Sequence, residues 1–443
     1  MLDKRRGSVI SRLLGKLIGM LLFLLIKPSV MKRILCFFVL LSIVSCRSDD
    51  EEMTVAGNQA LVTGDPTLNT FIITSRDESV YTVDAQTGQE REIYTFEDLT
   101  SVEILAEYDN GTIFVTTDDN AVNALDPAGP SLLWDTPMLD YQFNSRGLTE
   151  PVCLDGTCYA SGEFGVVVAL EENSGDLKWY YSTDPDGELE NTLNENETPI
   201  VHNDKVYVFS EEGFINDLPP YMHILDKQSG ELLQRLELPA ELTGTPLFDG
   251  NTLYLPAGNL YAYDAETLEP MWTFEATGVG PPSVRDGKVV VHIIPPDNTT
   301  SSVLYCLDAT TGRELWAIAT GSATLWAPLI VEDVVFGVYD NVSSFAGPAG
   351  RPFAALLADG ELIWFLEDVQ IDHDPVYANG RLFFHGHAIS RTSDIDQDVG
   401  LMSIDANTGE IEWLNGFFGT GSHITPLVVA DNGVFGPSYY RGK

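Results

Sequence analysis

An acidic segment near the C-terminus is a candidate for metal binding. Asp394, Asp396 and Asp398 alternate with other residues there, and carboxylate oxygens are ligands that Ca²⁺ prefers. Gly400 follows one place later than the glycine of an EF-hand loop. The spacing therefore leaves two interpretations open, a calcium loop of a different kind or a solvated acidic loop.

Two histidines beside polar residues form a second candidate metal site. His373 stands between Asp372 and Asp374, and His423 follows Ser422. Imidazole and carboxylate groups together can hold a transition metal. The alternative is a set of polar side chains that face a wet central channel. The same kind of loop carries Arg146, Glu150, Glu195, Glu197, Thr243, Thr245 and Trp326.

The cysteines indicate an oxidising compartment. Cys153 and Cys158 flank Asp155–Gly156, a dipeptide typical of a two-residue hairpin turn. If these two residues form the loop, the cysteines lie opposite each other at a non-hydrogen-bonded pair, close enough for a disulfide. Cys306 stands in a predicted strand, where we expect a buried thiol. The sequence contains no Cys-x-x-Cys-His haem motif, nucleophile elbow, metal-protease helix or phosphate-binding loop.

A repeated turn organises the strands that must position these groups. Asp308 opens one copy, Gly312 follows four residues later, and Trp316 stands at the eighth step. Eight copies recur at intervals of 38 to 55 residues, which indicates a repeat architecture with room for four short strands per copy. Six of the seven tryptophans stand at the eighth step. These structural docking residues are Trp134, Trp179, Trp272, Trp316, Trp364 and Trp413.

The turn has a physical basis in its residue types. An Asp at a strand end can accept hydrogen bonds from backbone amides two or three residues on, and Gly can adopt the positive φ that closes the turn. The tryptophan then offers a large apolar face to a neighbouring sheet. We therefore predict an all-β, eight-bladed β-propeller of four-stranded antiparallel blades. Strands from both chain ends complete one blade, which leaves no open edge in the ring.

The repeat resembles a known family. The pattern Ala-x-Asp-x-x-Thr-Gly-x-x-x-Trp, with variants beginning at Ala124, Ala169, Ala262, Cys306 and Ser403, is similar to the tryptophan-docking motif of pyrroloquinoline-quinone (PQQ)-like propellers. That family includes quinoprotein dehydrogenases and outer-membrane assembly lipoproteins of the BamB type. The resemblance implies that an enzyme of this family would hold PQQ and calcium, with an Asp base and a Cys–Cys ring. The residues of that set are not identified in this sequence.

The N-terminal region resembles a lipoprotein signal. Met31 and two basic residues precede an apolar run, and Ile43-Val44-Ser45-Cys46 looks like a lipobox. We predict a signal region over 1–45 with a true start at Met31, lipidation of Cys46, and an acidic tether over 46–68. The propeller would span 69–437, followed by a tail at 438–443. Residues 48–52 resemble a signal for export to the cell surface, so the anchor is predicted on either the periplasmic or the outer face.

The charge balance excludes one class of partner. The net charge is −42, and removal of residues 1–45, which carry eight basic residues and one acid, leaves about −49. Such a chain repels phosphate, so no nucleic-acid partner is expected. We predict a monomeric, lipid-anchored scaffold that binds envelope or outer-membrane proteins, with no cofactor. The alternatives are a PQQ-dependent oxidoreductase and a surface module that binds a glycan or another ligand.

Overall fold

The computed structural model describes residues 62–64, 69–96, 105–117, 119–129, 131–138, 148–162, 165–183, 198–210, 219–297, 301–321, 325–340, 350–371, 374–388, 398–418, 427–430 and 433–435. Contacts divide the chain into Met1–Asn58 and Gln59–Lys443, and all described residues belong to the second unit. Among them, no helix has the length and apolar character that a membrane crossing requires.

Four sheets contain four antiparallel strands each, hydrogen bonded in sequence order. The first is β4 (Leu105–Asp109), β5 (Thr112–Thr117), β6 (Ala121–Asp126) and β7 (Ser131–Pro137). The second is β8 (Val152–Leu154), β9 (Thr157–Gly162), β10 (Val166–Glu171) and β11 (Leu177–Ser182). The third is β12 (Ile200–His202), β13 (Lys205–Ser210), β14 (Tyr221–Asp226) and β15 (Leu232–Glu237). The fourth is β16 (Leu247–Asp249), β17 (Thr252–Ala257), β18 (Asn259–Asp264) and β19 (Pro270–Phe274).

Two sheets of five strands follow the same plan with one strand added. One contains β20 (Gly278–Val279), β21 (Ser283–Arg285), β22 (Lys288–Ile294), β23 (Val303–Asp308) and β24 (Glu314–Ala319). The other contains β1 (Thr70–Arg76), β2 (Ser79–Asp84), β3 (Glu90–Thr95), β34 (Leu427–Ala430) and β35 (Gly433–Phe435). Strand β34 runs antiparallel to β1, with Val429 opposite Phe71, so segments from the two ends of the repeat region share one sheet.

The remaining sheet has nine strands. It contains β25 (Leu329–Val331), β26 (Val334–Asp340), β27 (Gly350–Leu356), β28 (Leu362–Phe365), β29 (Val369–Ile371), β30 (Val376–Ala378), β31 (Arg381–Ala388), β32 (Asp398–Asp405) and β33 (Ile411–Asn415), after which η2 (Gly416–Phe418) forms a 3₁₀ turn. The sequence predicts two separate four-stranded sheets here, but β29 pairs with both β27 and β31. A Cβ atom on Gly386 would lie 2.2 Å from the Gln370 carbonyl oxygen, so glycine is what allows β29 to approach β31.

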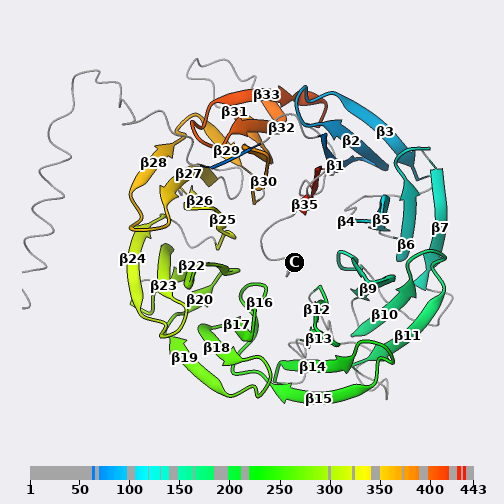
Figure 1. Cartoon of the computed structure of the whole chain (residues 1–443), viewed down its shortest axis with the longest axis horizontal. Coiled ribbons are helices and arrows are strands. Elements are labelled where there is room, and N and C mark those ends of the chain that lie inside the picture. Colours follow the sequence, from blue (N-terminus) through cyan, green and yellow to red (C-terminus); the bar gives the residue numbers. More distant parts are fainter. Residues whose placement is uncertain are drawn as a thin grey trace, which may run out of the picture. The chain divides into compact units, whose positions relative to one another are not determined.

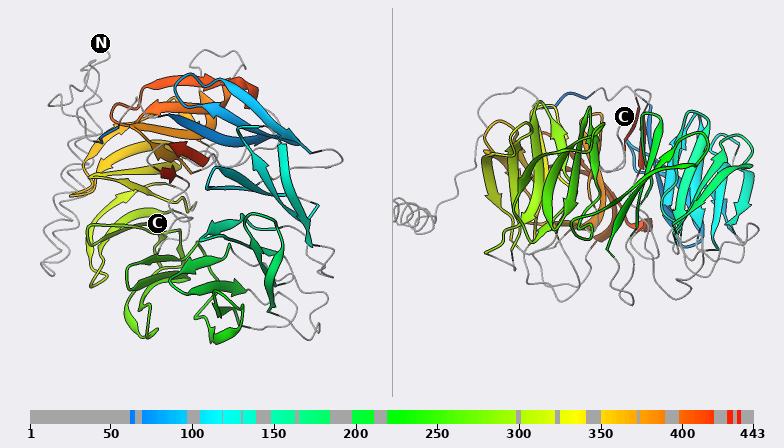
Figure 2. Two further views of the ribbon diagram at one scale, coloured as in Figure 1. Left: turned by 45° about the vertical axis from the view of Figure 1, so that its right-hand side comes forward. Right: turned by 90° about the horizontal axis from the view of Figure 1, so that it is seen from below.

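The sheets follow one another in sequence order around a central axis (Figure 1). Some neighbouring inner strands touch, as β4 and β8 or β21 and β25 do, and β34 lies against β30 on one side and β4 on the other. Figure 1 shows the strands of a sheet following one another outward from the centre, as β16 to β19 do, and Figure 2 shows the sheets from two other directions. The C-terminal strand β34 therefore shares a sheet with the N-terminal strand β1.

The apolar core lies in layers between neighbouring sheets. One such layer joins Val167 and Trp179 of the second sheet to Val206, Val208 and Leu225 of the third. Burial of each such aliphatic side chain contributes about 1.5–3 kcal/mol. Because such a layer joins two sheets, the stability of one sheet depends on its neighbour.

Candidate functional site

In the repeated turn, the Asp carboxylate accepts hydrogen bonds from residues of the same turn. Asp308 Oδ1 accepts hydrogen bonds from the Thr311 hydroxyl at 2.6 Å and the Thr311 backbone N–H at 2.8 Å. These bonds, the hydroxyl first, hold the pKa of Asp308 below its usual value. Equivalent bonds occur at Asp84, Asp226 and Asp264. The acids of the turns are therefore charged groups that stabilise the turn.

Six tryptophans connect successive copies in a joint of constant geometry. Each indole N–H donates to the backbone carbonyl of the residue that follows the first residue of the next turn. The pairs are Trp134–Glu172 (3.0 Å), Trp179–Lys227 (3.1 Å), Trp272–Ala309 (2.8 Å), Trp316–Leu357 (3.0 Å), Trp364–Ala406 (3.0 Å) and Trp413–Ala85 (3.0 Å). The last pair joins the final copy to the first.

Each joint also contains a glycine. The indole ring lies against the glycine at the fifth place of the next turn, as Trp272 lies against Gly312, where an added Cβ would be 2.6 Å from the ring. Gly312 has φ of +67°, which glycine adopts without strain. The same close approach occurs at Gly88, Gly175, Gly230, Gly360 and Gly409. The glycine therefore serves two needs, the turn conformation and the space for the indole.

Two copies lack the joint, and each lacks both halves of it. Glu92 and Gln234 stand where the tryptophan would be, and the turns that follow have Pro130 and Leu268 in place of glycine. Next to Glu92, Arg91 Nη2 donates to the Pro127 carbonyl at 2.6 Å. This carbonyl is equivalent to the acceptors of the tryptophan joints, so the arginine replaces the indole.

The second missing joint leaves β15 as the most exposed outer strand. No residue of β15 is buried and all but Leu236 are exposed, whereas β24 has the buried Trp316 at its centre. Leu232 and Leu233 are 40% and 52% exposed. Among the described residues β15 is the last strand of its sheet, so one edge of its backbone is available for pairing. Apolar side chains on a free edge are the features that bind an added partner strand.

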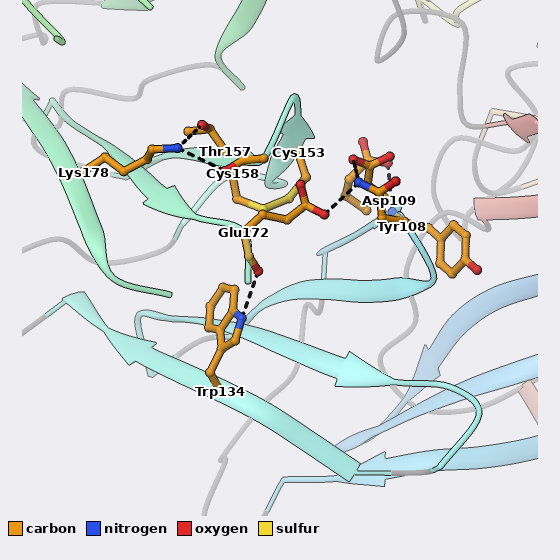
Figure 3. The surroundings of a disulfide bond; sticks show 11 residues. Tyr108, Asp109, Trp134, Cys153, Thr157, Cys158, Glu172 and Lys178 are labelled. Atoms are coloured by element: carbon orange, nitrogen blue, oxygen red, sulfur yellow. Dashed lines mark hydrogen bonds between the residues drawn. A yellow bond between two sulfur atoms is a disulfide. The ribbon is translucent and has the colours of Figure 1, made fainter. Parts of the chain in front are cut away.

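The disulfide belongs to a buried hairpin. Cys153 and Cys158 are bonded and lie opposite each other in the β8–β9 pairing (Figure 3). Asp155 and Gly156 form the turn with φ of +53° and +78°. Both cysteines pack in an apolar cluster with Phe114. A disulfide enclosed in this way is not placed to lie over a bound quinone, so we derive no step through such a cofactor.

The predicted metal ligands are mostly beyond the described residues. Asp394, Asp396, His373, His423 and the lipidation residue Cys46 fall outside the described ranges, and Asp398 is placed only by its backbone in β32. Within those ranges, no three His, Cys, Asp or Glu side chains gather closely enough to hold a metal ion. The described acids and histidines do not provide a calcium or transition-metal donor set, and these assignments remain predictions.

The described residues of the connecting loops make structural contacts. The Thr243 hydroxyl donates to the Val279 carbonyl at 2.9 Å, and Asp374 accepts a hydrogen bond from the Ala327 backbone N–H at 3.0 Å. Trp326 was expected at the channel mouth, but its side chain is buried in the apolar cluster of the nine-stranded sheet. Aromatic burial outweighed its position in a loop. Arg146, Glu195, Glu197, Asp372 and Ser422 lie outside the described residues.

A buried histidine cluster escaped the sequence analysis. His223 is fully buried, and its Nδ1 and Nε2 atoms lie 2.9 Å from the hydroxyls of Tyr181 and Ser210. Burial, with a smaller effect of Arg235, lowers the pKa of His223 to about 4. The cluster joins the second and third sheets, and the sequence signal that identifies it is a histidine inside an apolar strand. His292 is a second case, with its pKa lowered by burial to about 3.

The chain matches the family model described as "Outer membrane protein assembly factor BamB" over residues 76–291 and 277–364. One curated relative, a tetrathionate hydrolase from Acidithiobacillus ferrooxidans, is 23% identical over 66% of this chain and 61% of its own length. Another, BamB from Nitrosomonas eutropha, is 28% identical over 38% of this chain and 37% of its own length. The chain therefore spans less than two thirds of either relative.

Solved structures with low sequence identity share the fold. BamB from Moraxella catarrhalis superposes with a TM-score of 0.51 at 15% identity, over 82% of this chain and 95% of the other. A quinohemoprotein alcohol dehydrogenase from Comamonas testosteroni gives 0.51 at 14% identity, over 79% and 70%. These likenesses place the chain among all-β propellers, a fold that both a scaffold and an enzyme can use.

Proposed function

Because the chain belongs to the PQQ-like repeat family of the outer membrane protein assembly factor BamB, we propose that it is a protein-binding scaffold of the bacterial outer membrane. Its proposed role is in envelope assembly, without a chemical reaction of its own. The match over residues 76–364 is the observation that carries this proposal. The role itself comes from the family, and the partner-binding edge comes from this chain.

The proposed scaffold is an eight-bladed propeller over residues 69–437. Eight copies of the turn support this number, and each copy accompanies a group of four strands when β20, β29 and β35 are counted as additions. The blade of β1, β2 and β3 takes its fourth strand, β34, from the C-terminal end. The joint from Trp413 to Ala85 ties that blade to the preceding one. The result is a rigid ring suited to hold partners in fixed positions.

We propose that the edge of β15 is one surface that binds a partner. It combines a free backbone edge with Leu232 and Leu233 exposed on one strand. An extended segment of an envelope protein can pair with this edge through main-chain hydrogen bonds, while its apolar side chains cover the two leucines. The remaining outer strands for which a tryptophan joint is described are fixed to the next copy.

The proposed anchor is a lipid on Cys46, joined to the ring by the acidic tether of 46–68. This places a monomeric scaffold at the outer membrane, on the periplasmic face or at the cell surface. The Cys46→Ser variant supplies the matched control for localisation. It is expected to leave the membrane fraction or to accumulate as an uncleaved precursor, whereas unchanged detergent partitioning would exclude the lipid anchor.

Affinity capture from crosslinked envelopes tests the scaffold against the enzymatic alternative. We expect outer-membrane assembly proteins to be captured with the wild-type chain, and fewer with a Leu232→Ser, Leu233→Ser variant. In parallel, the purified protein is mixed with PQQ and Ca²⁺ and assayed for dye-linked oxidation of alcohols and sugars. Stoichiometric quinone binding with turnover, and no captured assembly protein, would replace the scaffold with an oxidoreductase.

A further inference from the structure

A pocket of about 440 Å³ lies between β24 and the strands β26–β28. Its walls include Ile318 of β24, Tyr339 of β26, Arg351 and Phe353 of β27, and Leu362 and Phe365 of β28. Tyr339 and Phe365 meet edge to face.

 The separation of these two rings is 5.7 Å between centroids, with an interplanar angle of 88°. The pocket is therefore mostly aromatic and apolar, with one cationic side chain in its wall.

In the third sheet, the positions equivalent to those that line the pocket carry the side chains of the His223 cluster. Phe353 on β27 lies opposite Phe365 on β28, and at the equivalent positions of the third sheet His223 lies opposite Arg235. Tyr339 pairs with Arg351 as Ser210 pairs with Tyr221. Ile318 stands two residues after Trp316, as Tyr181 stands two residues after Trp179. The pocket and the His223 cluster are therefore built on equivalent positions of two copies.

In the His223 cluster, the polar groups satisfy one another. Both ring nitrogens of His223 have hydroxyl partners, and the Arg235 guanidinium lies 3.6 Å above the ring of Tyr221. The equivalent place in the pocket has Phe353 in place of the histidine, and its arginine stands on β27 instead of on the outer strand. Among the described residues, no hydrogen-bond partner is present for the Nε atom of this arginine.

Arg351 carries an unsatisfied donor into this apolar site. Its Nε atom is buried without a hydrogen-bond partner, and the described part of the chain gives its guanidinium no ion pair. A buried polar donor without a partner is unfavourable, and a guanidinium binds carboxylates through two parallel N–H···O bonds. An anion at this position would provide what the chain itself does not.

We propose that the Arg351 pocket binds a small amphipathic carboxylate. The aromatic or aliphatic body of the ligand packs against Tyr339, Phe353 and Phe365, and its carboxylate accepts hydrogen bonds from Arg351. The volume suits a small organic ligand. The net charge of −42 disfavours ligands with several negative charges, so a monoanion is the expected class.

Three probes of one shape test this assignment on the intact purified protein. They are 3-phenylpropionate, 3-phenylpropan-1-ol and 3-phenylpropylamine, compared by isothermal titration calorimetry. We expect the acid to bind about 10-fold tighter than the alcohol, since a hydrogen bond to a charged group contributes roughly 1.4 kcal/mol or more, or one factor of ten. The amine should bind weakest, because it brings a second cation to Arg351.

Two variants locate the site. Arg351→Met should remove the preference for the acid over the alcohol, and Ala319→Leu, which fills part of the pocket, should weaken both. The matched control is Arg235→Met at the other cluster, which should leave acid binding within about 2-fold. Circular dichroism melting curves establish that each variant is folded. Equal binding of acid and alcohol, an Arg351→Met variant with unchanged preference, or absence of binding by all three probes would overturn the proposal.

Discussion

At the scale of residues, the tryptophan and the glycine of each joint are present or absent together. Gly360 leaves the space in which the Trp316 ring lies, because an added Cβ would be 2.9 Å from that ring. Where the tryptophan is missing, glycine loses this role and a larger residue can take its place. Leu268 does so with φ of +58°, and its side chain packs on the apolar cluster of the third and fourth sheets.

Truncation of one joint tryptophan tests its structural role. Trp316 is 8% exposed and donates its indole N–H to the Leu357 carbonyl. We expect Trp316→Ala to lower the free energy of unfolding by about 3–5 kcal/mol, as large aromatic truncations in cores do. Leu315→Ala is the matched control, since Leu315 is exposed, and should change it by less than about 1 kcal/mol. Urea unfolding measures the loss of free energy in both variants. Equal losses would contradict a structural role for the Trp316 joint.

The buried His223 predicts a loss of stability in mild acid. Its pKa is about 4 in the folded chain and 6.5 in the reference state. Between these values the unfolded chain binds a proton that the folded chain does not, so stability falls as pH decreases from 6.5 to 4. The expected contribution is about 3 kcal/mol. The free energies of unfolding of wild type and His223→Gln, measured from pH 7 to 4, should converge as pH falls, because the variant has no histidine to protonate at this position. A constant difference between them would contradict the prediction.

At the scale of elements, the sequence predicted the strands and turns well because both have local signals. Asp-Gly turns, apolar strands and the eight-residue spacing of Trp316 from Asp308 can be read directly from the sequence. The carbonyl that each indole reaches lies in the next copy, so it depends on the angle between sheets and has no local signal. The short strand β29 and the buried position of Trp326 also depend on packing between sheets, and the sequence analysis missed both.

Introducing a tryptophan joint at β15 tests whether the tryptophan and the glycine are both needed to form it. Gln234→Trp alone places an indole where Leu268 stands, and we expect it to be neutral or destabilising. Combined with Leu268→Gly, the indole gains the space that six other joints provide. A double-mutant cycle should therefore show a favourable coupling of about 1 kcal/mol or more. Additive effects in urea unfolding would show that the two positions do not form a joint.

At the scale of the whole molecule, the excess of acids should make stability depend on salt. The chain carries a net charge of −42, and its unfolding separates like charges. Added salt shortens the reach of this repulsion from about 10 Å at 0.1 M to about 3 Å at 1 M. We expect the melting temperature to rise between 0.05 M and 1 M NaCl, as measured by circular dichroism.

A calcium titration at constant ionic strength separates general screening from specific sites. If the acids of 394–398 bind Ca²⁺, micromolar to millimolar Ca²⁺ should give most of the rise, and Asp396→Asn should reduce it. A melting temperature that responds to neither ion would contradict both explanations of the acidity.

The central claim is that this propeller works by holding envelope proteins, with β15 as one binding edge. Photo-crosslinking in living cells tests it most directly, with the reactive residue placed at Leu233 and, as a control, at Leu315 on a strand fixed by its joint. We predict that Leu233 crosslinks to an outer-membrane assembly protein and that Leu315 does not. A chain that crosslinks to no envelope protein through Leu233, or equally through both positions, would contradict the claim.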